Sequence, residues 1–345
     1  MKQRLFVILL SLLFFVSSHA LSQEIYQWVD DNGVIHYGQQ SPQQRTYKPR
    51  DDAAPEEAEP EASLQEPSHD TPPFSSGLLW KVETSASRET QPSPSYLFGT
   101  IHSDDPRVVR LPTEVQHALS QSDSFCMEIL PDTATMLTLM GSMLYTDGQT
   151  LEETIGQELF AQLTPLMQRR GISALALTKF KPWVVYMTLS MPQTQTGQFL
   201  DLVLHEQAKQ QDKSLCGIET AEEQVAVFEQ TPLADQLTLL REILRNPEGV
   251  EIQLQKMIPL YLRRDLAGLL ALSRDMADTT PDERRSIEAF LQRLLDDRNQ
   301  RMVERMLPRL DKGATFVAVG ALHLPGDQGL LQLLTDRGYT VSAVY

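Results

Sequence analysis

Apolar and polar positions along the chain follow two alternating patterns. Short runs of β-branched and aromatic residues predict buried strands, and longer stretches with apolar residues every three or four positions predict amphipathic helices. The expected strands are Leu78–Val82, Tyr96–Ile101, Ser124–Leu130, Lys213–Thr220, Ala314–Val319 and Tyr339–Val344. Helical periodicity fills most of Leu137–Met191, Gly197–Gln211 and Leu233–Pro308. This order predicts an α/β fold, with a mixed, mostly parallel sheet flanked by helices and a large helical insertion.

The N-terminal part of the chain has a different composition. Residues 1–22 begin with basic Lys2 and Arg4, continue as an apolar run and end in small residues, which is the pattern of a cleaved signal peptide. Residues 23–40 hold two strand-like runs around Asp-Asn-Gly and predict a small β-hairpin unit. Residues 41–76 are rich in Pro, Glu, Asp, Ser and Ala and predict a disordered linker. We therefore expect an exported protein, periplasmic or secreted, whose main domain covers residues 77–345.

The charge of the chain limits its partners. The net charge is −16, and it becomes −18 (−16 minus 2) when Lys2 and Arg4 leave with the signal peptide. Such an acidic chain is not expected to bind nucleic acid or anionic lipid. After the signal, no apolar run reaches the roughly 20 residues that span a bilayer. The expected partner is a peptide or small-molecule substrate.

The two cysteines, Cys126 and Cys216, both lie in strand-like runs. An oxidising compartment permits a bridge between them. The bridge requires that the two strands be neighbours, which the pattern of residues does not establish. A disulfide and a pair of buried thiols are both open at this point.

Two expected strands end in the same short motif, Gly-x-x-His. The first is Tyr96–His102 and the second is Phe316–His323. If the strands are parallel neighbours, both imidazoles lie at the carboxyl edge of the sheet, where open α/β folds bind ligands. The glycine is explained by a sharp turn or a close approach that leaves no room for a Cβ atom.

Two carboxylates are expected at the same edge. Glu128 interrupts an apolar strand, where an acid is costly unless it is paired, hydrogen-bonded or bound to a metal. Glu219 stands at the end of the next expected strand, either as a site carboxylate or as a cap for the helix that follows. Together with His102 and His323, they form a candidate site.

Two imidazoles and one or two carboxylates, without a serine or cysteine nucleophile in a comparable motif, fit a catalytic metal site. Mn, Co and Zn are the divalent ions considered. The ion would activate water and polarise a carbonyl, and a glutamate would act as the general base. A metal-free alternative is open, in which a histidine held by Glu128 activates water for ester cleavage.

From about residue 77 to the end, the chain resembles the TraB/GumN family, to which the Tiki proteases belong. The matching motifs are Leu-Phe-Gly-Thr-Ile-His at 97–102, the acidic strand at 125–130, Lys-Pro-Trp at 181–183, Gly-Ile-Glu-Thr with Glu-Glu-Gln at 217–224, Arg-Asn at 298–299 and Gly-Ala-Leu-His-Leu-Pro-Gly at 320–326. The N-terminal hairpin is similar to a small domain of unknown function found in proteobacterial envelope proteins.

The resemblance implies a fold related to erythromycin-esterase-like and haem-binding ChaN-like proteins. It also implies a metal-dependent protease whose metal ligands are His102, Glu128 and His323. Arg298 and Asn299 match a family pair that faces the site, and Glu219 joins them as a candidate catalytic residue. The expected function is that of a periplasmic metal-dependent hydrolase, a peptidase by preference. The alternative is a non-catalytic binding protein that sequesters a peptide or a haem-like ligand.

Overall fold

The computed structural model describes residues 26–29, 35–38, 74–84, 92–191, 196–276 and 279–345. They fall in two compact units. In the smaller unit, β1 (Tyr26–Val29) and β2 (Ile35–Gly38) pair as an antiparallel hairpin, which confirms the hairpin predicted in residues 23–40. The predicted signal peptide, residues 1–22, and nearly all of the predicted linker lie outside the described residues.

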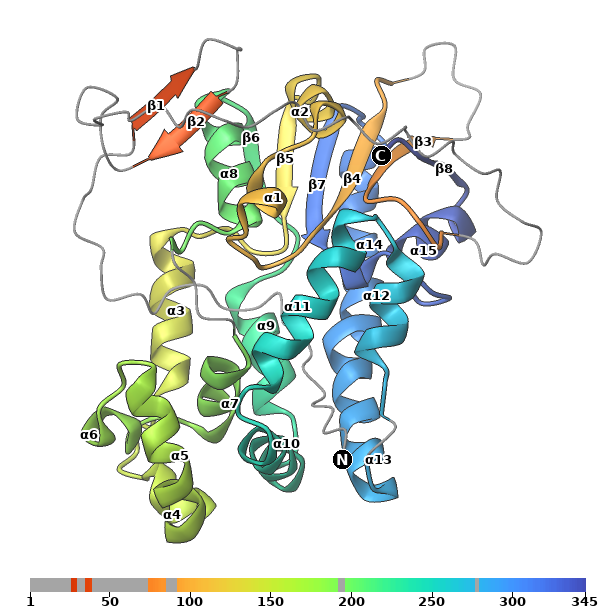
Figure 1. The fold of residues 1–345 in the computed structure, drawn as a ribbon. Coiled ribbons are helices and arrows are strands. Elements are labelled where there is room, and N and C mark those ends of the chain that lie inside the picture. Colours follow the sequence, from red (N-terminus) through yellow and green to blue (C-terminus); the bar gives the residue numbers. More distant parts are fainter. Residues whose placement is uncertain (1–25, 30–34, 39–73, 85–91, 192–195, 277–278) are drawn as a thin grey trace, which may run out of the picture. The chain divides into compact units, whose positions relative to one another are not determined.

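The larger unit is built on one six-stranded sheet. Its strands are β3 (Leu79–Thr84), β4 (Ser95–Thr100), β5 (Ser124–Met127), β6 (Ser214–Gly217), β7 (Thr315–Gly320) and β8 (Tyr339–Ala343). They lie in the order β6-β5-β7-β4-β3-β8 (Figure 1). The pairs β6–β5, β5–β7 and β7–β4 are parallel, and β3 runs antiparallel to both of its neighbours. The predicted mixed, mostly parallel sheet is confirmed.

Helices make up most of the remaining described chain. They are α1 (Pro106–Val109), α2 (Thr113–Ser120), α3 (Thr133–Met143), α4 (Leu151–Ile155), α5 (Gln157–Arg169), α6 (Ala174–Leu177), α7 (Pro182–Ser190), α8 (Leu200–Gln210), α9 (Ala221–Glu229), α10 (Leu233–Arg245), α11 (Gly249–Leu262), α12 (Leu266–Ser273), α13 (Pro281–Leu291), the π-helix η2 (Gln292–Asp296), α14 (Asp297–Leu310), the 3₁₀-helix η3 (Ala321–His323) and α15 (Leu330–Asp336). Figure 1 shows α3–α7 and α9–α13 mostly beyond the carboxyl ends of the parallel strands. None of the helices in the described ranges is long and apolar enough to cross a membrane.

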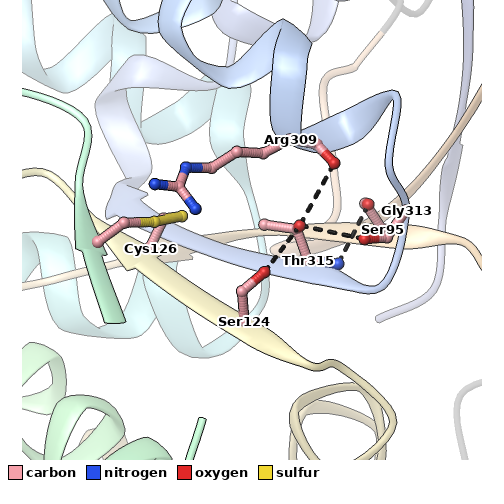
Figure 2. The surroundings of a disulfide bond; sticks show 7 residues. Ser95, Ser124, Cys126, Arg309, Gly313 and Thr315 are labelled. Carbon is pink, nitrogen blue, oxygen red and sulfur yellow. Dashed lines mark hydrogen bonds between the residues drawn. A yellow bond between two sulfur atoms is a disulfide. The ribbon is translucent and has the colours of Figure 1, made fainter. Parts of the chain in front are cut away.

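A disulfide joins the neighbouring strands β5 and β6 of the sheet. Cys126 on β5 and Cys216 on β6 are direct partners in the parallel ladder, and they form a disulfide. Figure 2 shows the same stretch of β5 tied to β7, where Ser124 Oγ lies 3.0 Å from Thr315 Oγ1. The sequence left open whether Cys126 and Cys216 form a disulfide or stay as buried thiols. The structure has the disulfide, because the fold makes β5 and β6 adjacent.

The first Gly-x-x-His motif packs directly on the second. β4 and β7 are parallel neighbours, with Thr100 opposite Gly320, as expected. A Cβ atom on Gly99 would lie 3.1 Å from Ala321 Cα and 2.8 Å from Leu324 Cδ1. The glycine is therefore required by close approach between the two motifs, one of the two reasons that the sequence offered.

Replacing Gly99 with alanine is expected to lower the free energy of unfolding by about 1–3 kcal/mol, as overpacking of a tight core does. Chemical denaturation of the full chain measures this loss. The matched control is Gly141→Ala in α3, where an added Cβ meets no other atom within 4 Å. That control is expected to be neutral or slightly stabilising, since alanine favours a helix. Equal stability of the two variants would contradict the close packing of the motifs.

Candidate functional site

Four of the predicted site residues follow the carboxyl ends of four parallel strands. His102 comes two residues after β4, and Glu128 comes directly after β5. Glu219 follows β6, and His323 closes the 3₁₀-helix η3 that continues β7. Because the parallel strands are consecutive in the sheet, all four residues stand at one edge, and all four are buried. The topology thus brings the carboxyl ends of these four strands to one edge of the sheet, which was the condition for the predicted site.

The two carboxylates lie just outside their strands. The predicted strand Ser124–Leu130 ends at Met127, and the predicted strand Lys213–Thr220 ends at Gly217. Glu128 is therefore not an acid inside a strand, as the sequence suggested, but the first residue beyond one. Glu219 is not the cap of the following helix, because Thr220 caps α9 and accepts a hydrogen bond from the Glu223 backbone amide.

Arg298 lies between the two carboxylates. It comes from the start of α14, and its side chain is completely buried. Its Nε donates to Glu219 at 3.0 Å, and its Nη2 donates to both Glu219 and Glu128 at 2.5 Å. Burial by itself lowers the pKa of Arg298, but the attraction of the two glutamates raises it overall, so the guanidinium stays charged. Arg298 thus contacts both predicted carboxylates directly.

Glu128 connects Arg298 to the second motif. While Oε2 accepts from Arg298, Oε1 accepts a hydrogen bond from the Gly320 amide at 2.7 Å. The same Oε1 atom is 3.7 Å from His323 Nε2. Burial and the nearby Glu219 raise the pKa of Glu128, and Arg298 offsets this effect only in part. Its carboxyl group is therefore easier to protonate than an exposed glutamate.

His323 is held by Asn299. Asn299 Nδ2 donates to the Gln328 carbonyl at 2.7 Å, so that its Oδ1 is left to accept from His323 Nδ1 at 2.6 Å. The proton of a neutral imidazole then resides on Nδ1 and the lone pair on Nε2. Burial and the charge of Arg298 lower the pKa of His323 well below its usual range, which keeps the ring neutral. Within the part of the chain that the structure describes, His323 Nε2 is buried and has no hydrogen-bond partner.

His102 is held by an aspartate that the sequence analysis missed. His102 Nδ1 lies 2.8 Å from Asp201 Oδ2, and Thr100 Oγ1 donates to Asp201 Oδ1 at 2.6 Å. Although burial alone raises the pKa of Asp201, attraction to His102 and the hydrogen bonds from His102 and Thr100 lower it overall. Asp201 stands in the first turn of α8, where an acid is usually explained by the helix dipole. The available signal that it faces inward was its spacing, three residues before Leu204 and seven before Ala208 on the buried face of α8.

The donors have the chemistry of a divalent-metal site. Each imidazole has its Nδ1 held by a side-chain oxygen, an arrangement that orients metal-binding histidines, and His323 offers a buried lone pair. Within the described residues, however, no group of three or more His, Cys, Asp or Glu side chains is gathered closely enough to hold a metal ion. Part of the reason is that Arg298 already binds one oxygen of Glu128 and both oxygens of Glu219. The donor types fit an ion, but the predicted three-residue set is not assembled.

Comparison with known proteins places most of the chain in one group. "Metalloprotease TIKI1" of Homo sapiens is 28% identical, over 76% of this chain and 61% of its own length. "Metalloprotease TIKI2" of Danio rerio is 26% identical, over 76% of this chain and 60% of its own. "Uncharacterized protein YbaP" of Escherichia coli is 29% identical, over 69% of this chain and 87% of its own. The chain therefore spans about 60% of the length of these TIKI relatives.

Two family profiles match the chain. A domain of unknown function, DUF4124, matches residues 10–66 and so covers the N-terminal hairpin. No solved structure matches the chain. The profile of the TraB/PrgY/gumN family matches residues 78–343, which hold both Gly-x-x-His motifs, Glu128, Glu219 and the Arg298–Asn299 pair. On this match across most of its length, the chain belongs to the TraB/PrgY/gumN family.

Proposed function

We propose that the protein is a metal-dependent hydrolase that cleaves peptide bonds at the carboxyl edge of its sheet. The observation that carries the proposal is the Nε2 atom of His323, which is buried, lies beside the carboxylate of Glu128 and has no hydrogen-bond partner among the described residues. The names of the TIKI relatives as metalloproteases support the same reaction class. His102 and His323 would hold the ion, as Mn, Co or Zn, and Glu128, a third ligand in the sequence prediction, would serve as the general base because Arg298 already binds its Oε2.

Each residue of the site has a separate task. When bound, a divalent ion supplies Lewis acidity that polarises the carbonyl of the bond to be cleaved. Asn299 keeps the lone pair of His323 on Nε2. Glu128, whose pKa is raised, accepts a proton from the attacking water and returns it to the leaving amine. Arg298, with Glu219 behind it, fixes the Glu128 carboxylate so that Oε1 faces His323.

A small cavity next to His102 supports a hydrolytic reaction. Its volume is about 20 Å³, and its lining includes Thr100, His102 and Gly320 together with apolar side chains of α11 and α12. A cavity of this size holds about one water molecule. Room for a water molecule beside His102 supports the hydrolase.

The metal content of the purified full chain tests the proposal. We expect stoichiometric Mn, Co or Zn in the wild type, and loss of the ion and of peptide cleavage in His102→Ala and His323→Ala. His117→Ala is the matched control, because His117 is exposed on α2. A wild type that retains no ion at micromolar metal would contradict metal dependence. Ester or peptide hydrolysis that persists in that protein would favour the metal-free histidine reaction.

The proposed compartment is the periplasm or the exterior of the cell. The Cys126–Cys216 disulfide supports an oxidising compartment, where such bonds persist. The apolar, signal-like residues 1–22 support export. Mass spectrometry of the protein from a periplasmic extract would show a mature N-terminus near Ser22 if the proposal holds, and an intact Met1 in the cytoplasmic fraction if it does not.

A further inference from the structure

We propose that Asp201 positions the His102 imidazole for its task in the site, and that Thr100 in turn positions Asp201. This inference rests on the proposed function for the role of His102, but its geometry stands independently of the metal. It names a positioning pair in which Thr100 lies within the first Gly-x-x-His motif and Asp201 lies outside both motifs. The pair spans β4 and α8, elements separated by about a hundred residues of chain.

The contacts around Asp201 divide its two oxygens between two partners. Oδ2 lies 2.8 Å from His102 Nδ1, and Oδ1 accepts the Thr100 hydroxyl at 2.6 Å. The side chains of His102 and Asp201 are only 7% and 11% exposed, so water does not weaken the contact. Because both oxygens are engaged, the carboxylate cannot rotate without losing a buried interaction. His102 Nδ1 therefore meets a fixed acceptor.

A fixed acceptor on Nδ1 determines the form of the ring. An ionised carboxylate only accepts hydrogen bonds, so Nδ1 must carry a proton, and the lone pair of a neutral ring is on Nε2. Asn299 imposes the same arrangement on His323. Each motif histidine is thus held through Nδ1 by a residue from a helix, α8 or α14, and each presents Nε2 for chemistry.

The two holding residues differ in charge. His102 is held by a carboxylate, that of Asp201, and His323 is held by an amide, that of Asn299. The alternative is a purely structural role, in which the Asp201 contact only anchors the start of α8 to the end of β4.

Nitrogen NMR of the full chain, with ¹⁵N-labelled histidine and without metal, separates the two readings. The His102 signals are assigned by their loss in His102→Gln. In the wild type we expect a protonated Nδ1, and in Asp201→Asn a shift of the proton toward Nε2, because the amide can donate to Nδ1. Asp212→Asn is the matched control, since Asp212 is exposed, just after α8. Unchanged His102 signals in a folded Asp201→Asn protein would overturn the proposal, because a mere anchor does not control the tautomer.

Zn²⁺ affinity gives a second readout. Loss of a residue that orients a metal-binding histidine weakens the metal by about 10–100-fold, and we expect this in Asp201→Asn. If Asp201→Asn does not fold, Thr100→Val decides, because it removes the hydroxyl but keeps the carboxylate. A smaller shift of the His102 signals in Thr100→Val supports the proposal, and an unchanged spectrum overturns it. If the wild type binds no Zn²⁺ but Asp201→Asn still changes the His102 tautomer, the proposed function is contradicted and the positioning role of Asp201 is supported.

Discussion

Replacing Arg298 with alanine is expected to lower the free energy of unfolding by about 3–5 kcal/mol, the loss typical of breaking a buried ion pair from one side. The guanidinium is fully buried and donates to both Glu128 and Glu219. Without it, two buried carboxylates face each other with no cation between them. Urea denaturation of the full chain, followed by circular dichroism, measures the change.

Two variants show whether this loss comes from the buried network. Arg285→Ala removes an arginine that is 75% exposed and pairs with Asp282 on the surface, and it is expected to change stability by less than about 1 kcal/mol. Arg298→Met combined with Glu128→Gln and Glu219→Gln removes the charges of these three residues and should recover part of the loss. A loss in Arg298→Ala as small as in Arg285→Ala would contradict the central role of Arg298.

The stability of Arg298→Ala is also expected to depend on pH. Glu128 already has a raised pKa in the presence of Arg298, and removal of the cation raises it further. A carboxyl group whose folded pKa exceeds its unfolded value stabilises the fold fully at low pH, and this contribution is lost as the pH rises from the unfolded pKa to the folded one. The deficit of Arg298→Ala should therefore shrink as the pH falls from 7 toward the unfolded pKa of glutamate, about 4.3. A deficit that grows over that range would contradict this assignment.

Loss of the disulfide is the second large effect. Cys126 and Cys216 are 90 residues apart in the chain, and a cross-link that closes a loop of this length stabilises the fold by up to about 4–5 kcal/mol through the entropy of the unfolded chain. The variant Cys126→Ala/Cys216→Ala is expected to lose most of that amount. Denaturation midpoints of the oxidised and reduced wild type and of the double variant measure it.

The reduced wild type is the matched control, since it keeps both side chains and loses only the bond. It should approach the double variant in stability, with the remaining difference due to the packing of two buried sulfur atoms. Because Glu128 and Glu219 follow the two cysteines by two and three residues, reduction should also weaken metal binding at the site. Equal stability of the oxidised and reduced wild type would contradict the entropic argument.

The sheet edge could be predicted because its signals are local. An apolar run followed by Gly-x-x-His marks a strand and its end in a few residues, and the repeat of this pattern at 96–102 and 316–323 identified both strands of the β4–β7 pair. Glu128 was found because an acid beside a strand has few structural explanations. Its predicted place inside the strand was wrong, since β5 ends at Met127 and Glu128 is the first residue after it.

The partners of these residues could not be predicted, because they come from helices whose local pattern is ordinary. Asp201 occupies a first-turn position that suits any acid. Arg298 follows the π-helix η2, whose wider turn changes which residues of α14 face the sheet. Helical periodicity alone would have placed this charged segment on the surface. Only its resemblance to a family motif drew attention to Arg298 and Asn299.

The sequence by itself determined which segments form strands, which end of the two motif strands carries the histidine and which residue types lie at the carboxyl edge. These features depend on neighbours within a few positions of the chain. The tertiary structure decided which residues touch. It paired Cys126 with Cys216, placed Arg298 between Glu128 and Glu219, and put Asp201 and Asn299 on the two imidazoles. These contacts join residues 24 to 170 positions apart, and a buried charge selects its partner by three-dimensional proximity, which local patterns do not encode.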